Sequence, residues 1–214
     1  MYPRAFAEKI KMETYFPMNM TLFHFINASE TPIALTVVIA KGFAILSPWV
    51  AMSLATFYWL FGTSGQRRSL MIAGISLSSG LAANFLFATL TYAPRPFELG
   101  VGQILLIHAA ETSFPSDHAT FLWALGFGLL VTRQLRVLGI VISMLGLATA
   151  WARIYVGVHF PLDMAASFLI SVLSAVLARA LAGKFDSFLF QPLEQINSHI
   201  VWVIRHSFTK NRDE

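Results

Sequence analysis

The sequence predicts an all-α bundle of about five helices that cross a membrane. Of the 214 residues, 56% are hydrophobic and only 12% are charged, and the mean hydropathy is +0.64. Soluble domains carry about 25% charged residues, so this composition indicates that much of the chain lies in a bilayer. The sequence contains no cysteine, which excludes disulfides and thiolate metal sites.

Five apolar runs are long enough to be membrane-spanning helices, since a span needs about 20 largely apolar residues. They cover residues 33–62, 69–90, 118–135, 137–153 and 161–182. The first run is about 30 residues long and contains Pro48. It predicts either one kinked helix or an interfacial helix followed by a span.

Basic residues between the apolar runs predict how the chain is oriented in the membrane. They follow the first, third and fifth runs as Arg67 with Arg68, Arg133 with Arg136, and Arg179 with Lys184. The positive-inside rule places all of them in the cytoplasm and residues 91–117 and 154–160 on the outer side. The same alternation puts residues 1–30 outside, although this segment contains several basic residues, so the side of the N-terminus stays open.

The net charge of +4 raises the question of nucleic-acid binding. The basic residues lie mostly in short segments between apolar runs, which is typical of membrane topology rather than of a binding patch. We therefore expect no nucleic-acid partner and one integral-membrane domain over residues 1–214. Its last part, residues 185–214, is expected to lie on the cytoplasmic surface as an amphipathic tail.

Arg153, His159 and Asp163 form the most demanding of three polar motifs. Arg153 closes the fourth apolar run, and His159 and Asp163 flank the start of the fifth. Because His159 and Asp163 are four residues apart, their side chains meet if they share one helical turn. A carboxylate bonded to one ring nitrogen fixes the tautomer and leaves the other nitrogen as a nucleophile. The alternative is that His159 and Asp163 are two unrelated polar residues at a membrane interface. The presence of Arg153 in the same segment makes this alternative less favoured.

Pro115-Ser116-Asp117-His118 is typical of the start of a helix. Ser116 or Asp117 would cap this helix, and its unpaired N–H groups would attract an anion. His118 on the first turn would face the same anion and act as a general acid. An ordinary N-cap explains Ser116 and Asp117 but gives His118 no role.

Arg95-Pro96 follows Pro94 at the outer end of the second run. An arginine holds phosphate oxygens in a bidentate manner, and prolines on both sides stiffen its backbone. Taken alone, Arg95 is more typical of a snorkelling interfacial residue. Its position on the same predicted face as the other two motifs favours a phosphate-binding role.

Together, these segments resemble the type 2 phosphatidic acid phosphatase superfamily, whose signature is Lys-x6-Arg-Pro, then Pro-Ser-Gly-His, then Ser-Arg-x5-His-x3-Asp. The resemblance covers a core from residue 85 to residue 165. It implies that His159 attacks phosphorus, that Asp163 orients His159, and that His118 protonates the leaving group. The implied phosphate-binding set is Arg95, Ser116, Asp117 and Arg153.

Three positions depart from that signature. Ala88, Asp117 and Ala152 stand where the signature has lysine, glycine and serine. Residues 113–118 and 152–163 are similar to one branch of the superfamily, the bacterial undecaprenyl-diphosphatases associated with bacitracin resistance. The departures therefore favour a subfamily rather than an inactive enzyme.

The polar residues outside the three motifs give weaker indications of function. Lys41 lies inside the first apolar run, where an ionisable group is costly and indicates function. It is a possible accessory residue that supplies the cation missing at Ala88, and a snorkelling lysine is an equal alternative. His108 and Glu111 belong to the outer loop, where a solvated position is the simpler interpretation. No group of residues has the spacing of a metal site, and the resemblance implies a reaction without metal or cofactor.

The resemblance implies a multi-pass enzyme of the bacterial cytoplasmic membrane. It would remove the terminal phosphate of undecaprenyl diphosphate, the lipid carrier of cell-wall synthesis, at the outer face and through phosphohistidine. The expected partners are this polyprenyl diphosphate and the bilayer. Phosphatidic acid, phosphatidylglycerol phosphate and phosphate transfer to lipid A are alternatives with the same chemistry. A non-catalytic lipid-binding protein or a transporter belongs to another class, and ionisable groups gathered at one face argue against the transporter.

Overall fold

The structure is a computed structural model that describes residues 17–198. All regular structure in this range is helical, which confirms the predicted all-α class. The helices are α2 (Pro17–Ile26), α3 (Ala34–Phe61), α4 (Ser64–Leu90), α5 (Asp117–Leu130), α6 (Arg136–Tyr155) and α7 (Pro161–Phe185), with the short helices η1 (Pro96–Leu99) and η2 (Asp186–Phe190). Residues 1–16 and 199–214 lie outside the described range, and with them the basic N-terminal segment and the last part of the predicted tail.

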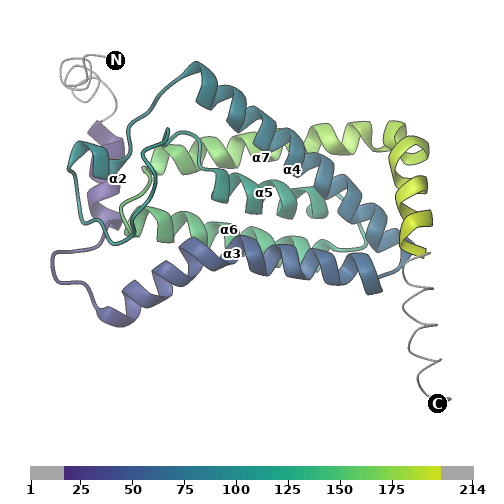
Figure 1. Cartoon of the computed structure of the whole chain (residues 1–214), viewed down its shortest axis with the longest axis horizontal. Helices are drawn as coiled ribbons and strands as arrows, with labels where there is room; N and C mark the ends of the chain where they lie inside the picture. Colours follow the sequence, from purple (N-terminus) through teal and green to yellow (C-terminus); the bar gives the residue numbers. More distant parts are fainter. Residues whose placement is uncertain (1–16, 199–214) are drawn as a thin grey trace.

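Four of these helices, α3, α4, α6 and α7, are long and apolar enough to cross a membrane. They correspond to four of the predicted spans, so the chain is a multi-pass membrane protein. The first apolar run forms one continuous helix, α3, with Pro48 inside it. Figure 1 shows that α3 bends near its middle, as expected for a helix in which a proline ring disturbs the preceding turn.

Helix α5 is shorter than the span predicted for residues 118–135. It contains 14 residues and is about 21 Å long, against about 30 Å for the hydrocarbon core. The shortfall lies at the far end of the helix, because α5 ends at Leu130 and residues 131–135 form a turn in which Thr132 Oγ1 donates to Leu129 O (2.7 Å). Helices α4, α6 and α7 pack around α5, and protein rather than lipid surrounds most of it.

Glycines let the neighbouring helices approach α5 closely. A Cβ atom on Gly128 would lie 2.6 Å from the Cα atom of Ala73 in α4, and one on Gly126 would lie 2.5 Å from Ser143 Oγ in α6. Close approach of this kind holds membrane helices together because dispersion contacts replace the hydrophobic effect. These contacts lie in the half of α5 away from the three motifs and fix how α4, α5 and α6 pack there.

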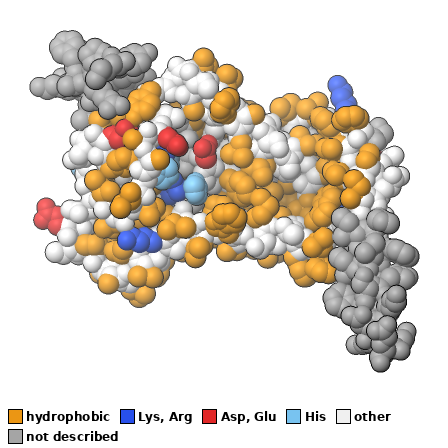
Figure 2. Space-filling model, in the orientation of Figure 1, with side chains coloured by type: hydrophobic (Ala, Val, Ile, Leu, Met, Phe, Trp, Pro, Cys, Tyr) orange, Lys and Arg blue, Asp and Glu red, His pale blue; other side chains and the backbone are white. Residues whose placement is uncertain are grey.

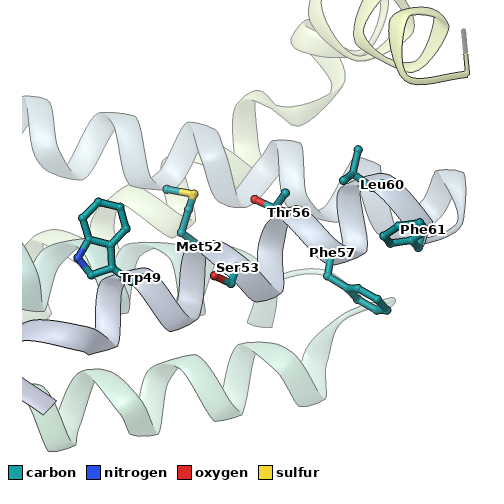
Figure 3. Close-up of a pocket in the computed structure, with 7 residues that line it drawn as sticks. All are labelled: Trp49, Met52, Ser53, Thr56, Phe57, Leu60 and Phe61. Atoms are coloured by element: carbon teal, nitrogen blue, oxygen red, sulfur yellow. The ribbon is translucent and has the colours of Figure 1, made fainter. Parts of the chain in front are cut away.

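The outward faces of the bundle are apolar. Large exposed side chains cover α3, α6 and α7, for example Leu35, Val137 and Leu173, and Figure 2 shows hydrophobic side chains over much of the visible surface. A shallow hollow of about 370 Å³ is lined by residues between Trp49 and Phe61 that all belong to α3. Figure 3 shows these side chains along the helix. Such a surface fits contact with lipid tails.

One end of the bundle gathers α2 and the segments that carry the three motifs (Figure 1). Phe23 of α2 packs against Phe160, with ring centroids 5.2 Å apart. Asn27 accepts a bond from Gln103 N (2.6 Å) and donates to Tyr155 O (3.0 Å), which ties the long loop between α4 and α5 to the end of α6. The motifs thus meet at one end, as the sequence predicts.

Candidate active site

His159 lies at the centre of the motif end, in the turn between α6 and α7. Its Nδ1 atom is 3.1 Å from Asp163 Oδ2, and its Nε2 atom is 3.1 Å from Arg95 Nη1 and 3.3 Å from Arg153 Nη2. Arginine only donates hydrogen bonds, so Nε2 is the acceptor and Nδ1 carries the proton that bonds to Asp163. The Nε2 lone pair therefore points between two guanidinium groups.

His159 is electrically neutral in this environment. Its side chain is 2% exposed, and burial together with the charges of Arg153 and Arg95 holds its pKa well below the ordinary value of 6.5. A neutral imidazole with a fixed tautomer has a lone pair that is available for attack on phosphorus.

Asp163 holds the imidazole in place through one oxygen, Oδ2. This oxygen accepts bonds from His159 Nδ1, from Phe160 N (2.8 Å) and, through a short contact, from Ser113 Oγ. The local sequence explains the position, because Pro161 starts α7 and the carboxylate three residues after Phe160 reaches back to the free N–H there. Ser113 is fully buried, and no pattern in the sequence marked it as part of the site.

Arg95 is anchored by backbone carbonyls rather than by carboxylates. Its guanidinium donates to Glu111 O (3.1 Å), Val158 O (3.0 Å) and Thr112 O (3.2 Å). Arg95 is only 4% exposed. These bonds bring the loop after α4 against the turn before α7. The predicted snorkelling alternative for Arg95 does not fit this buried position.

Arg153 ends α6 inside the bundle and is 2% exposed. Its Nη1 donates to Ala44 O of α3 (3.2 Å), and its Nη2 lies near His108 Nε2 (3.1 Å) as well as His159. Its Nε is buried without a hydrogen-bond partner among the described residues. A buried donor without a partner is costly, and an anion at this position would satisfy it.

His108 is a second residue whose position the sequence did not reveal. The simpler interpretation placed it in a solvated loop, whereas the structure shows it half-buried against Arg153. Its Nδ1 donates to Ala109 O (3.2 Å), so its Nε2 accepts from Arg153. Burial is the main reason why the pKa of His108 lies below 6.5, and the two arginines lower it further.

Ser116 and His118 stand at the start of α5, as the sequence predicts. Ser116 is the N-cap residue but makes no side-chain cap bond, so the predicted cap is not formed. Its Oγ atom is instead buried without a partner among the described residues, while its backbone N donates to Ser167 Oγ (2.9 Å). His118 is half-buried on the first turn, within electrostatic range of Arg153 and Arg95.

Asp117 is exposed at the rim of the site, and its carboxylate is directed toward α4. Its Oδ1 accepts a bond from Asn84 Nδ2 (2.8 Å), which also donates to Thr120 Oγ1 (3.0 Å). Within residues 17–198, no hydrogen bond joins Asp117 to Arg95 or Arg153. Asp117 replaces the glycine of the signature, and Asn84 holds its carboxylate away from the arginines. Nothing in the sequence marked Asn84 for this role.

Of the other two departures from the signature, Ala152 is fully buried in α6. Ala88 is exposed on α4, one turn after Asn84. Lys41 is half-buried on α3, and no hydrogen bond or ion pair links it to another residue in the described part of the chain. Its accessory role stays a prediction.

The side chains around His159 Nε2 form a site for an anion. The guanidinium groups of Arg95 and Arg153 both donate toward this atom. The buried Ser116 Oγ and the first turn of α5 offer further donors at the same end of the bundle. Figure 2 shows His and Arg or Lys side chains next to Asp or Glu side chains in a recess of the surface. The fold is that of a polytopic membrane protein in which buried arginine and histidine side chains gather at one end of the bundle.

The family model for the PAP2 superfamily matches residues 69–186. This match covers more than half of the chain, and the chain belongs to the PAP2 superfamily. All three motifs lie inside the matched range.

Comparisons with individual proteins agree with this membership. The chain is 32% identical to the putative undecaprenyl-diphosphatase YbjG of Escherichia coli over 83% of this chain and 89% of the relative. It is 36% identical to the undecaprenyl-diphosphatase BcrC of Bacillus subtilis over 56% of this chain and 61% of the relative. The crystal structure of LpxE from Aquifex aeolicus superposes with a TM-score of 0.65 at 23% identity, covering 77% of this chain and 96% of that chain, and thus shares the fold.

Proposed function

We propose that the protein is a phosphatase that removes the terminal phosphate of undecaprenyl diphosphate through a phosphohistidine intermediate. The observation that carries the proposal is the position of His159 Nε2 between Arg95 and Arg153. Ser116 Oγ and Arg153 Nε, at the same end of the bundle, are buried without a partner among the described residues. A phosphoryl group at this point would receive hydrogen bonds from all of them. The names of the relatives from Escherichia coli and Bacillus subtilis support the choice of substrate.

In the first step, His159 Nε2 forms a bond to the terminal phosphorus. The bond between that phosphorus and the bridging oxygen breaks, and undecaprenyl phosphate leaves with a proton from His118. Arg95 and Arg153 stabilise the charge on the phosphoryl oxygens. Asp163 keeps the proton on Nδ1 and stabilises the positive charge that develops on the ring.

In the second step, water attacks the phosphorus of phosphohistidine. His118, now neutral, takes a proton from that water, the P–N bond breaks, and inorganic phosphate leaves. His159 returns to its neutral form with the lone pair on Nε2. The cycle consumes one water molecule and needs no other reactant.

A lipid substrate fits the surface around the recess. The last turns of α4 carry the exposed side chains Phe85, Leu86 and Leu90, close in sequence to Asn84, which bonds to Asp117 at the rim. An isoprenoid chain could therefore stay against apolar side chains while its diphosphate reaches the buried arginines. We propose that this end faces the outer side of the bacterial cytoplasmic membrane, because Arg67, Arg68 and Arg133 lie toward the other end.

Phosphate release by the purified protein in detergent tests the reaction. We expect turnover of undecaprenyl diphosphate that a chelator leaves unchanged, and slower turnover of phosphatidic acid and phosphatidylglycerol phosphate. His118→Ala should lose about 10²–10⁴-fold on phosphatidic acid and less on the diphosphate, whose leaving oxygen is less basic. Equal losses on both lipids would remove His118 from the acid role, and inactivation by the chelator would contradict the metal-free mechanism.

Thiol labelling tests the orientation, since the native chain has no cysteine. Ala110 and Gln134 are exposed in loops at opposite ends of the bundle. In intact cells, Ala110→Cys should react with a membrane-impermeant maleimide added outside, whereas Gln134→Cys should react only after the cells are permeabilised. The reverse pattern would place the site in the cytoplasm.

A further inference from the structure

Pro48 interrupts the hydrogen bonding of α3 at the level of the site. Proline has no backbone N–H, so the carbonyl four residues earlier loses its partner within the helix. That carbonyl belongs to Ala44, which is fully buried. A buried carbonyl needs another donor, because leaving it unpaired costs free energy.

Arg153 supplies that donor. Its Nη1 lies 3.2 Å from Ala44 O, across the contact between α3 and α6. We propose that Pro48 is a positioning residue, which frees the Ala44 carbonyl so that it can hold the guanidinium of Arg153 beside His159. The proposal rests on the proposed function, in which Arg153 binds the phosphoryl group.

A second contact fixes the register of α6 against this part of α3. Thr149, one turn before Arg153, donates through Oγ1 to Phe43 O (3.3 Å). The same carbonyl accepts from Ser47 Oγ at 2.7 Å. Two successive carbonyls of α3, at Phe43 and Ala44, thus bond to α6 directly before the proline. The bend of α3 near its middle lies in this region (Figure 1).

The geometry explains why a backbone carbonyl suits this position. The three nitrogens of the Arg153 guanidinium have different partners. Nη1 bonds to Ala44 O, and Nη2 faces His159 and His108. Nε has no partner among the described residues and is available to a ligand. A carboxylate at the place of Ala44 O would neutralise the charge that attracts phosphate. A carbonyl orients the group and leaves its full charge.

Pro48→Ala tests the proposal, because it returns an N–H that competes with Arg153 for Ala44 O. We expect kcat/KM for undecaprenyl diphosphate to fall about tenfold, with a melting temperature that is unchanged or higher. A role of Pro48 in folding alone predicts the opposite, a loss of stability. Ser47→Ala is the matched control, since it leaves Ala44 O free for Arg153, and it should keep wild-type kcat/KM.

Replacing Pro48 by lactic acid separates the missing donor from the proline ring. This backbone ester has neither ring nor N–H, so it should keep kcat/KM close to wild type. The affinity for orthovanadate should follow the same order, lower for Pro48→Ala and near wild type for the ester, and it is a readout that does not depend on turnover. An ester as impaired as Pro48→Ala, or an unimpaired Pro48→Ala, would overturn the proposal. An inactive wild-type protein would instead overturn the proposed function.

Discussion

At the end of the bundle that carries the motifs, Arg95 and Arg153 are 4% and 2% exposed and bond to carbonyls and histidines. At the opposite end, two other arginines bond to carboxylates. Arg67 Nε donates to Glu194 Oε2 (2.6 Å), and Arg68 Nε donates to Asp186 Oδ1 (2.7 Å). The Arg68 and Asp186 side chains are 46% and 39% exposed.

The comparison shows how the same side chain serves two purposes. At the opposite end, each arginine is neutralised by its carboxylate partner, and the exposed Arg68–Asp186 pair contributes only about 0–1 kcal/mol to stability. At the motif end, the buried carboxylate of Asp163 bonds to His159 and to neutral donors, and no carboxylate forms an ion pair with Arg95 or Arg153 in the described part of the chain. Two buried positive charges thus remain available, which is costly for folding and suited to binding an anion.

Removing His159 should have the largest effect. His159→Ala takes away the Nε2 atom that lies between Arg95 and Arg153, so we expect kcat/KM to fall by about 10⁴-fold or more. His24→Ala on the exposed face of α2 is the matched control and should keep full activity. Phosphate release by His159→Ala above a few per cent of wild type would show that another group attacks phosphorus.

Exchanging the arginines for lysines tests the comparison of the two ends directly. Arg153→Lys keeps the charge but cannot reach Ala44 O, the phosphoryl group and the histidines at once, so kcat/KM should fall about 10²-fold. Arg68→Lys should change it by less than about twofold, since its partner is an exposed carboxylate. Similar losses at both positions would mean that charge alone matters.

A smaller effect is expected at Ser113. Without its hydroxyl, the Oδ2 atom of Asp163 keeps two of its three donors, so the imidazole is held less firmly. Ser113→Ala should lower kcat about tenfold and leave KM unchanged. Ser79→Ala, which removes a hydroxyl bonded within α4, is the control. A change confined to KM would place Ser113 in substrate binding instead.

The smallest effect concerns the dependence of stability on pH. The pKa of His159 and that of His108 are lowered from 6.5, in both cases mainly by burial. Below about pH 6.5 the unfolded chain therefore binds protons that the folded protein does not, and the free energy of unfolding falls as the pH falls. Melting temperatures measured from pH 7.5 downward should show this decline in wild type and a weaker one in His108→Ala. An equal decline in both would exclude a contribution from His108.

The sequence predicted the parts of the site that depend on local spacing. His159 and Asp163 are one helical turn apart, and Arg153 and His118 lie at helix ends. Their residue types and their spacing in the sequence were therefore sufficient to predict that they lie at the same end of the bundle. Which loop residues turn inward was not predictable, because those contacts join distant positions. Ser113 meets Asp163 across 50 residues, His108 meets Arg153 across 45, and Ala44 meets Arg153 across 109. No local pattern encodes the path of the loop or the bend of α3 that makes them.

The length of α5 shows the same limit. Hydropathy predicted a span to residue 135, but hydropathy does not distinguish a helix surrounded by lipid from one surrounded by other helices. The helix begins at Asp117, next to the predicted start, but it ends at Leu130, and residues 131–135 form the turn that leads into α6.

The central claim is that His159 Nε2 attacks phosphorus, and trapping the intermediate tests it most directly. Wild-type protein mixed with undecaprenyl diphosphate labelled in its terminal phosphate and quenched in alkali should carry label on His159. Phosphohistidine is stable in alkali and labile in acid, so acid should release the label. His159→Ala should carry none, and His24→Ala should carry as much as wild type. Label on another residue, or phosphate release with inversion at phosphorus and no labelled protein, would contradict the account.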